Sequence, residues 1–274
     1  MSLARIEARF AALAREGRAA FVPYVVAGDP DAETSWKILR QLPAAGADLI
    51  ELGLPFSDPM ADGPAIQRGA SRALAAGTDT MSVLALSRRF READPHTPLI
   101  LMGYYNPVLA FGLQPFAAAA AEAGVDGLIM VDVPPEESAP LADALEAHDL
   151  ALVRLATPTT DAARLEIVGR RARGFLYFVS VTGVTGVKEA NAMAIATQVR
   201  RARVATGLPV AVGFGVRTPE HAREVAGIAD AVVVGSVLVE EIAASLALSR
   251  DPAPNVLATA AAMAQAVRTA RKGV

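Results

Sequence analysis

The sequence predicts an α/β fold, a (β/α)8 TIM barrel, formed as one domain over residues 1–274. Two observations carry this prediction. Short apolar runs rich in Val, Ile and Leu recur eight times along the chain, and stretches with helical spacing separate them. Eight such units in about 250 residues match the size of this barrel. The alternative is a doubly wound open sheet, but eight units and the lack of an early GxGxxG motif favour the barrel.

Each apolar run is continuous rather than alternating, which is typical of strands buried on both faces of a parallel sheet. The predicted strands are FVPYVVAG (21–28), ADLIELG (47–53), PLILMGYY (98–105), VDGLIMVDVP (125–134), LALVRLATP (150–158), GFLYFVSVT (174–182), PVAVGFGV (209–216) and DAVVVGSVL (230–238). In this fold the active site lies at the carboxyl-terminal ends of the strands.

The stretches between the strands carry helix boundary signals. Thr218 opens one helix with a capping hydroxyl followed by proline, and Gly124 and Gly207 close others. Residues 1–16 predict an extra amino-terminal helix placed to plug the bottom of the barrel, and residues 253–271 predict a final helix. About 50 residues separate the starts of the second and third strands, which predicts an insertion after strand 2 with two helical stretches.

The composition excludes several classes of protein. Just over half the residues are apolar, a fifth are charged, and the net charge is -3 with no long basic run. This balance argues against a nucleic-acid footprint and a polybasic membrane patch. The chain has no cysteine, which rules out disulfides and thiolate chemistry and suits the cytoplasm. We expect no signal peptide and no membrane span, because charges interrupt every long apolar stretch.

The ends of the last three strands are rich in glycine, in the segments SVTGVTG, GFG and GS. Glycine lets backbone N–H groups approach an anion closely, and Gly235-Ser236 opens a helix whose amino-terminal end favours negative charge. The loops after strands seven and eight form the usual phosphate site of such barrels. These segments predict phosphate binding, with ordinary tight turns as the alternative.

The positions of the lysines and histidines limit the kinds of catalysis that we expect. The three lysines are Lys37, Lys188 and Lys272, and none lies within a predicted strand, which argues against a Schiff base. The three histidines all fall before strands or in helices, on the wrong face of the barrel for a catalytic metal site. We therefore expect no metal, and expect carboxylates and tyrosine to carry proton transfer.

Glu51 is the leading candidate for proton transfer, because an acid at the end of an apolar run is partly desolvated and its pKa rises. A rim salt bridge is its alternative role. Asp62 and Tyr177 are further candidates, with a turn and the core as their alternatives. Asp58 and Asp132 are candidates to brace loops, and Asp132 is equally a candidate catalyst. Six side chains are candidates to wall an apolar slot, with plain core as the alternative: Phe214, Tyr24, Met102, Leu128, Ile66 and Tyr104.

Five segments, in order along nearly the whole chain, resemble the tryptophan synthase alpha chain family. They are ELGLPFSDPMADGPAIQ, GLIMVDVPPEE, YFVSVTGVTG, PVAVGFGVRTPE and DAVVVGSVLV. The first is long and specific, whereas the glycine turns alone would fit many phosphate barrels. The resemblance implies a lyase that cleaves indole-3-glycerol phosphate into indole and glyceraldehyde 3-phosphate by a retro-aldol step.

The resemblance also implies roles for particular residues. The catalytic acids of the family match Glu51 and Asp62, and its active-site tyrosine matches Tyr177. Its phosphate contacts match Gly186, Gly215, Gly235 and Ser236. Its indole pocket matches Tyr24, Met102, Leu128 and Phe214, with Tyr104 nearby. Tyr24 and Met102 depart from the phenylalanine and leucine expected there, and both changes keep the pocket apolar.

The family resemblance implies a partner as well. The alpha chain docks on a beta chain that holds pyridoxal phosphate, so we expect an αββα tetramer and no cofactor in this chain. We expect the loops SDPMADGPAIQ and SVTGVTGVKEAN to be mobile when empty and to close over the substrate. Asp58 is expected at the loop or partner contact. The rival functions are a sugar-phosphate isomerase or epimerase, and a non-catalytic phosphate-binding barrel that activates its partner.

Overall fold

The structure is a computed structural model that describes residues 2–179, 188–213 and 215–270. Within these residues eight parallel strands close into a barrel in sequence order, with β1 paired to both β2 and β8. The strands are β1 Ala20–Val26, β2 Ile50–Gly53, β3 Leu99–Gly103, β4 Gly127–Met130, β5 Ala151–Ala156, β6 Leu176–Val179, β7 Val210–Gly213 and β8 Ala231–Val234. The predicted barrel and its eight strands are confirmed.

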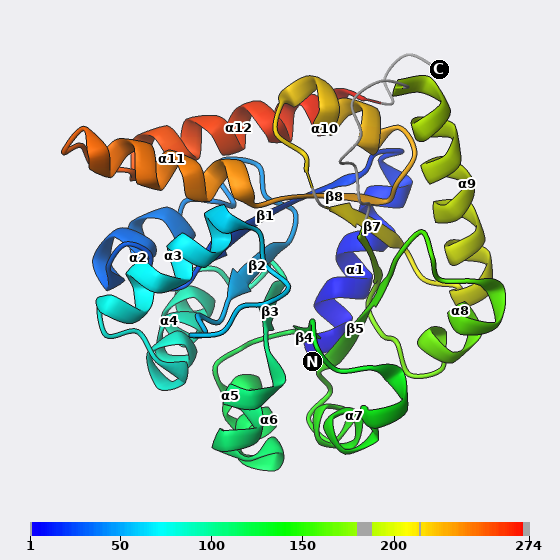
Figure 1. Ribbon diagram of the computed structural model, residues 1–274, viewed down its shortest axis with the longest axis horizontal. Helices are drawn as coiled ribbons and strands as arrows, with labels where there is room; N and C mark the ends of the chain where they lie inside the picture. The colour runs from blue at the N-terminus through cyan, green and yellow to red at the C-terminus, as the bar shows by residue number, and fades with distance from the viewer. Residues whose placement is uncertain (1, 180–187, 214, 271–274) are drawn as a thin grey trace.

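Helices surround the barrel (Figure 1). They are α1 Ser2–Arg15, α2 Ala32–Leu39, α3 Pro64–Ala75, α4 Thr80–Ala93, α5 Tyr105–Phe111, α6 Leu113–Glu122, the 3-10 helix η1 Pro135–Glu137, α7 Ala139–Glu146, α8 Ala162–Gly169, α9 Lys188–Thr206, α10 Pro219–Ala226, α11 Ser236–Ala247 and α12 Ala253–Thr269. The predicted insertion after strand 2 is confirmed as the loop 54–63 with α3 and α4.

The helix boundaries follow their local sequence signals. Asp31 and Asp79 accept backbone N–H groups at the starts of α2 and α4, and Thr218 does the same ahead of a proline in α10. Gly124 and Gly207 follow α6 and α9 with φ of 77° and 69°, a left-handed conformation that glycine adopts without strain. These predicted helix ends are confirmed.

The extra helix α1 covers one end of the barrel, and in Figure 1 it is seen through the ring of strands. Its buried residues Ile6, Phe10 and Leu13 recur at helical spacing and pack with the inward side chains of the strands. The rings of Phe10 and Phe175 lie 5.7 Å apart at their centroids. Helix α1 therefore covers the amino-terminal end of the barrel interior.

Candidate active site

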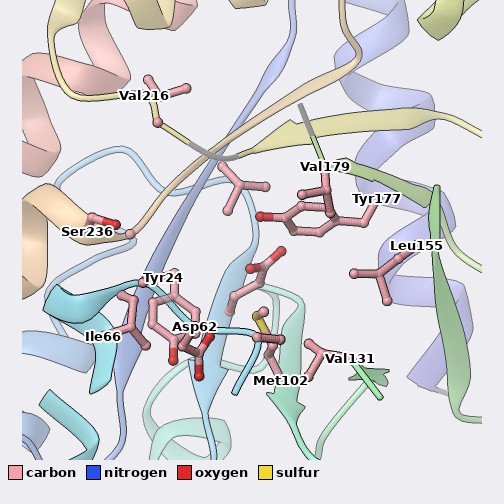
Figure 2. Close-up of a pocket in the computed structure, with 16 residues that line it drawn as sticks. Tyr24, Asp62, Ile66, Met102, Val131, Leu155, Tyr177, Val179, Val216 and Ser236 are labelled. Carbon is pink, nitrogen blue, oxygen red and sulfur yellow. The ribbon is translucent and has the colours of Figure 1, made fainter. Parts of the chain in front are cut away.

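A cavity of about 350 Å³ lies at the carboxyl-terminal ends of the strands (Figure 2). Its walls come from all eight strands or the loops after them, and from the start of α3. The lining residues are Tyr24, Glu51, Ala61, Asp62, Gly63, Ile66, Met102, Val131, Leu155, Tyr177, Val179, Gly215, Val216, Val233, Gly235 and Ser236. A mostly apolar cavity with a few polar groups is typical of a small-molecule site.

Glu51 on β2 is fully buried, and its carboxylate lines this cavity. Neither carboxylate oxygen has a hydrogen-bond partner among the described residues. Burial raises the pKa of Glu51 to about 8. The described residues therefore provide no salt bridge for this acid, and a protonated carboxyl faces the cavity at neutral pH.

Asp62 reaches the same cavity from the loop 54–63. Its Oδ2 accepts a hydrogen bond from the Tyr104 hydroxyl at 3.1 Å, and that hydroxyl accepts the backbone N–H of Ala61 at 2.9 Å. Burial raises the pKa of Asp62, and the Tyr104 hydrogen bond opposes this rise. Tyr104 also packs its ring 5.4 Å from that of Phe56, so one tyrosine contacts both ends of the loop. Tyr104 thus lies behind Asp62 and is not among the residues that line the cavity.

Two tyrosines enter the cavity from separate strands, Tyr24 from β1 and Tyr177 from β6 (Figure 2). A Cβ atom at Gly53 would lie 2.3 Å from the Tyr24 hydroxyl oxygen, and one at Gly213 would lie 2.1 Å from that of Tyr177. The two glycines therefore leave the space that these hydroxyls occupy. Burial, followed by nearby acidic charge, raises the pKa of both tyrosines, which keeps them neutral hydrogen-bond donors.

Part of the predicted phosphate site lies within the residues that the structure describes. Gly215, Gly235 and Ser236 line the cavity, and Ser236 begins the twelve-residue helix α11. In Figure 2 Ser236 and Val216 lie on one side of the cavity and Leu155 and Val131 on the other. The amino-terminal end of α11 favours an anion on its side. Gly186 and Phe214 lie outside the described residues.

The placement of Leu128 in the pocket is wrong. Leu128 belongs to the cluster between the strands and the helices, whereas Ile129 packs in the cluster inside the barrel. The register explains the difference, because Met102 lines the cavity and pairs with Ile129, while Leu128 pairs with the outward Leu101. Partners on neighbouring strands share a face, and successive residues alternate faces.

The candidate acids Asp58 and Asp132, and also Asp29, are not among the residues that line this cavity. Asp58 is exposed on the loop 54–63, and Asp132 is exposed with its Oδ1 accepting the Tyr105 backbone N–H at 2.9 Å. Asp132 therefore braces the start of α5. Asp29, after β1, is buried and forms a two-pronged ion pair with Arg72 of α3, at 2.7 and 2.8 Å. Asp29 and Asp132 therefore stabilise the fold, and Asp58 faces solvent.

Sequence reasoning missed several aliphatic residues that line the cavity: Val131, Leu155, Val179, Val216 and Val233. Two of them could have been found by alternation. Once Ile129 and Val153 are known to face inward, Val131 and Leu155 follow two positions later. Continuous apolar strands hide this phase, because both faces carry similar residues.

The chain is similar throughout its length to proteins of one family. A family model described as "Tryptophan synthase alpha chain" matches residues 10–268. The chain belongs to this family. It is 63% identical over 272 residues to the tryptophan synthase alpha chain of Phenylobacterium zucineum, covering 99% of this chain and 98% of the relative. It is 60% identical to that of Caulobacter vibrioides, covering 100% and 99%.

Solved structures agree with this assignment. The crystal structure of the tryptophan synthase alpha chain from Legionella pneumophila superposes with a TM-score of 0.89 at 40% identity, covering 97% of each chain. As a tryptophan synthase alpha chain, the protein is a lyase of tryptophan biosynthesis that cleaves indole-3-glycerol phosphate to indole and glyceraldehyde 3-phosphate. Membership also implies a beta chain as partner. Among the described residues, no helix is long and apolar enough to cross a membrane.

Proposed function

We propose that Glu51 carries both proton transfers of the cleavage. The observation behind this role is a fully buried carboxyl group that lines the cavity without a hydrogen-bond partner among the described residues. Since its pKa is raised to about 8, it begins the cycle protonated at neutral pH. It donates this proton to C3 of the indole ring, which converts the ring into an electron sink without lysine or metal.

The same carboxylate then closes the cycle. As the bond between C3 and the side-chain carbon breaks, its electrons return to the indole ring, and the hydroxyl on that carbon becomes the aldehyde of glyceraldehyde 3-phosphate. Glu51, now ionised, takes the hydroxyl proton and is ready for the next turn. The net proton transfer runs from the substrate hydroxyl to indole C3, so no external acid or base is consumed.

Asp62 is proposed to stabilise the charge that develops during this step. Protonation of C3 places positive charge on the indole nitrogen, and an ionised carboxylate that accepts the indole N–H stabilises it. The hydrogen bond from Tyr104 favours the ionised form of Asp62. Tyr177, neutral and beside the cavity, is proposed as a hydrogen-bond donor to the substrate. Gly215, Gly235 and Ser236 are proposed to hold the phosphate at the start of α11.

Indole release from indole-3-glycerol phosphate tests these roles. Glu51→Gln and Asp62→Asn are each expected to lower kcat by about 10²–10⁴-fold. Asp58→Asn is the matched control, because Asp58 is an exposed acid of the same loop that does not line the cavity. Its rate is expected to stay near that of the wild type. Rates within a few-fold of wild type for Glu51→Gln or Asp62→Asn would refute the assigned role.

We further propose that the chain works in the cytoplasm as the alpha subunit of an αββα tetramer. Pyridoxal phosphate then belongs to the beta chain, which receives the indole directly, and this chain needs no cofactor. Asp58 and the exposed Met60 lie on the loop 54–63 that also carries Asp62, which supports a contact between this loop and the partner. Light scattering of a mixture with the cognate beta chain is expected to give the mass of two alpha and two beta chains. Separate elution of the two chains would contradict the complex.

A further inference from the structure

Arg154 lies in the middle of β5 and is the only lysine or arginine in the eight described strands. Its neighbours Val153 and Leu155 face the barrel interior, so Arg154 points into the layer between the strands and the helices. Aliphatic and aromatic side chains such as Leu152 and Phe178 pack in that layer. Arg154 is only 6% exposed there, and a buried charge is costly unless it is paired.

The hydrogen bonds that reach Arg154 are too few to balance its charge. One guanidinium nitrogen donates to the hydroxyl oxygen of Ser138, and that hydroxyl donates to the carbonyl of Pro135 at 2.7 Å. The Arg154 Nε is buried and has no partner among the described residues. A neutral hydroxyl satisfies one donor but supplies no countercharge. Fully buried arginines are normally paired with a carboxylate or another anion.

The acidic groups that act on Arg154 or share its cavity are engaged elsewhere. Glu136, on the surface, pairs with Arg164. Asp132 accepts the backbone N–H at the start of α5 at 2.9 Å. Burial lowers the pKa of Arg154, the positive charge of Arg171 adds to this lowering, and Glu136 opposes it. The surroundings therefore leave the guanidinium without a dedicated countercharge among the described residues.

A second cavity, of about 260 Å³, adjoins this guanidinium. Arg154 lines it together with the apolar Met130, Val133 and Leu152 and two prolines. Val131 and Leu155 line both cavities, so the second lies behind one wall of the active site. It contains none of the residues assigned to the lyase reaction.

We infer that this second cavity binds a small organic monocarboxylate, with the carboxylate on Arg154 and its hydrocarbon part against the apolar wall. An arginine fork matches the geometry of a carboxylate, and the apolar lining holds a hydrocarbon. Asp132 also lines the cavity, so an inorganic dianion such as phosphate is disfavoured relative to a singly charged acid. The inference rests on the site around Arg154 alone and does not depend on the roles of Glu51 or Asp62.

Butyrate is the probe, and butyramide is its neutral isostere. Both are titrated into the full-length chain and followed by ligand-observed saturation-transfer NMR, with inorganic phosphate in a third titration. Arg154→Met removes the charge at similar volume. Arg201→Met is the matched control, because Arg201 also has a buried, unpaired Nε but lines neither cavity.

Wild type and Arg201→Met are expected to bind butyrate at least about tenfold more tightly than Arg154→Met does, and more tightly than either binds butyramide. Phosphate is expected to bind equally to wild type and Arg154→Met, because it occupies the other site. Arg154→Met is expected to melt no lower than wild type, since it removes an unpaired buried charge. Equal butyrate affinity in wild type and Arg154→Met, no butyrate binding at all, or phosphate binding that depends on Arg154 would overturn the inference.

Discussion

The acidic residues of the active site and those at the amino-terminal end of the barrel lie in opposite surroundings. At the amino-terminal end, Asp48, Asp126 and Asp230 each precede a strand and are fully engaged. At the carboxyl-terminal end, Glu51 has no partner among the described residues, and Asp62 has a single tyrosine hydroxyl. Carboxylates surrounded by hydrogen-bond donors thus stabilise the fold, whereas carboxylates with few or no donors are available for catalysis.

The amino-terminal acids repeat one arrangement. Asp126 exchanges hydrogen bonds with Leu99 at the start of the preceding strand, its Oδ2 accepting the Leu99 N–H and its own N–H donating to the Leu99 carbonyl, each at 2.9 Å. Asp48 and Asp230 do the same with the first and seventh strands. Each acid also pairs with at least one arginine. Three strands, β2, β4 and β8, are thereby fastened to the strands that precede them in the barrel.

Burial raises the pKa of acids in both places, but only at the amino-terminal end do positive charges oppose the rise. It raises the pKa of Asp126 to about 6 while Arg91 and Arg5 oppose the rise. It raises the pKa of Glu51 to about 8 with no opposing contribution. Hydrogen bonds and guanidinium groups therefore stabilise the ionised form at one end, and their absence leaves a proton available at the other.

The largest expected effect of a single substitution on stability at neutral pH is at the amino-terminal end. Asp126→Ala removes the acceptor for the Leu99 N–H and leaves two arginines without their carboxylate, so unfolding should become easier by about 3 kcal/mol. Urea denaturation measures this change, and kcat of the folded fraction should be retained. Asp143→Ala is the control, because its ion pair with Arg171 is at the surface and is worth about 0–1 kcal/mol. Similar losses in both variants would remove the contrast.

The next effect is a pH dependence of the free energy of unfolding, and it comes from Glu51. Its pKa is about 8 when folded and near its ordinary value of 4.5 when unfolded, so the folded chain holds the extra proton between these values. The free energy of unfolding should therefore fall as pH rises from about 4.5 to 8, by up to about 1.4 kcal/mol per pH unit from this group. Urea titrations at several pH values compare wild type with Glu51→Gln, in which this component should vanish. A pH dependence unchanged in Glu51→Gln would argue against the raised pKa.

The same proton sets the pH dependence of the reaction. Since the first step uses protonated Glu51, kcat/KM should fall above about pH 8, by about tenfold for each further pH unit. Initial rates of indole release between pH 6 and 10 measure this limb. Asp58→Asn should reproduce the wild-type profile. A plateau extending to pH 10 would mean that protonated Glu51 is not required in the free enzyme.

The fold was predictable from sequence because its determinants are local. Parallel strands covered on both faces need continuous apolar runs, and these marked all eight strands. Glu51 was equally visible, since an acid that ends such a run is exceptional. The sequence did not show which residues of each strand face the barrel interior, because a run that is apolar on both faces has no alternation of polar and apolar residues. Leu128 was for that reason placed in the pocket in place of its neighbour Ile129.

Contacts between distant segments were also beyond the sequence. Tyr104 and Asp62 are 42 positions apart, and nothing in either motif indicates their hydrogen bond. The pairing of Asp132 with the start of α5 is hidden in the same way. Arg154 stood inside a predicted strand, but only the tertiary structure places it beside a cavity and without a countercharge. The sequence thus predicts which chemical groups reach the site, while their hydrogen bonds depend on how the loops return to the barrel.

The smallest expected effect concerns the hydrogen bond that the Asp62 carboxylate accepts from the Tyr104 hydroxyl. Tyr104→Phe removes the donor to its Oδ2 and the acceptor for the Ala61 N–H, two bonds worth about 1 kcal/mol each, so kcat/KM should fall by up to about 30-fold. Tyr105→Phe is the neighbouring control and should leave the rate nearly unchanged. If Tyr104 acts by positioning Asp62, adding Tyr104→Phe to Asp62→Asn should cost little more, because the carboxylate it serves is already gone. Fully additive losses in the double variant would show instead that Tyr104 acts on the substrate or on the whole loop, independently of Asp62.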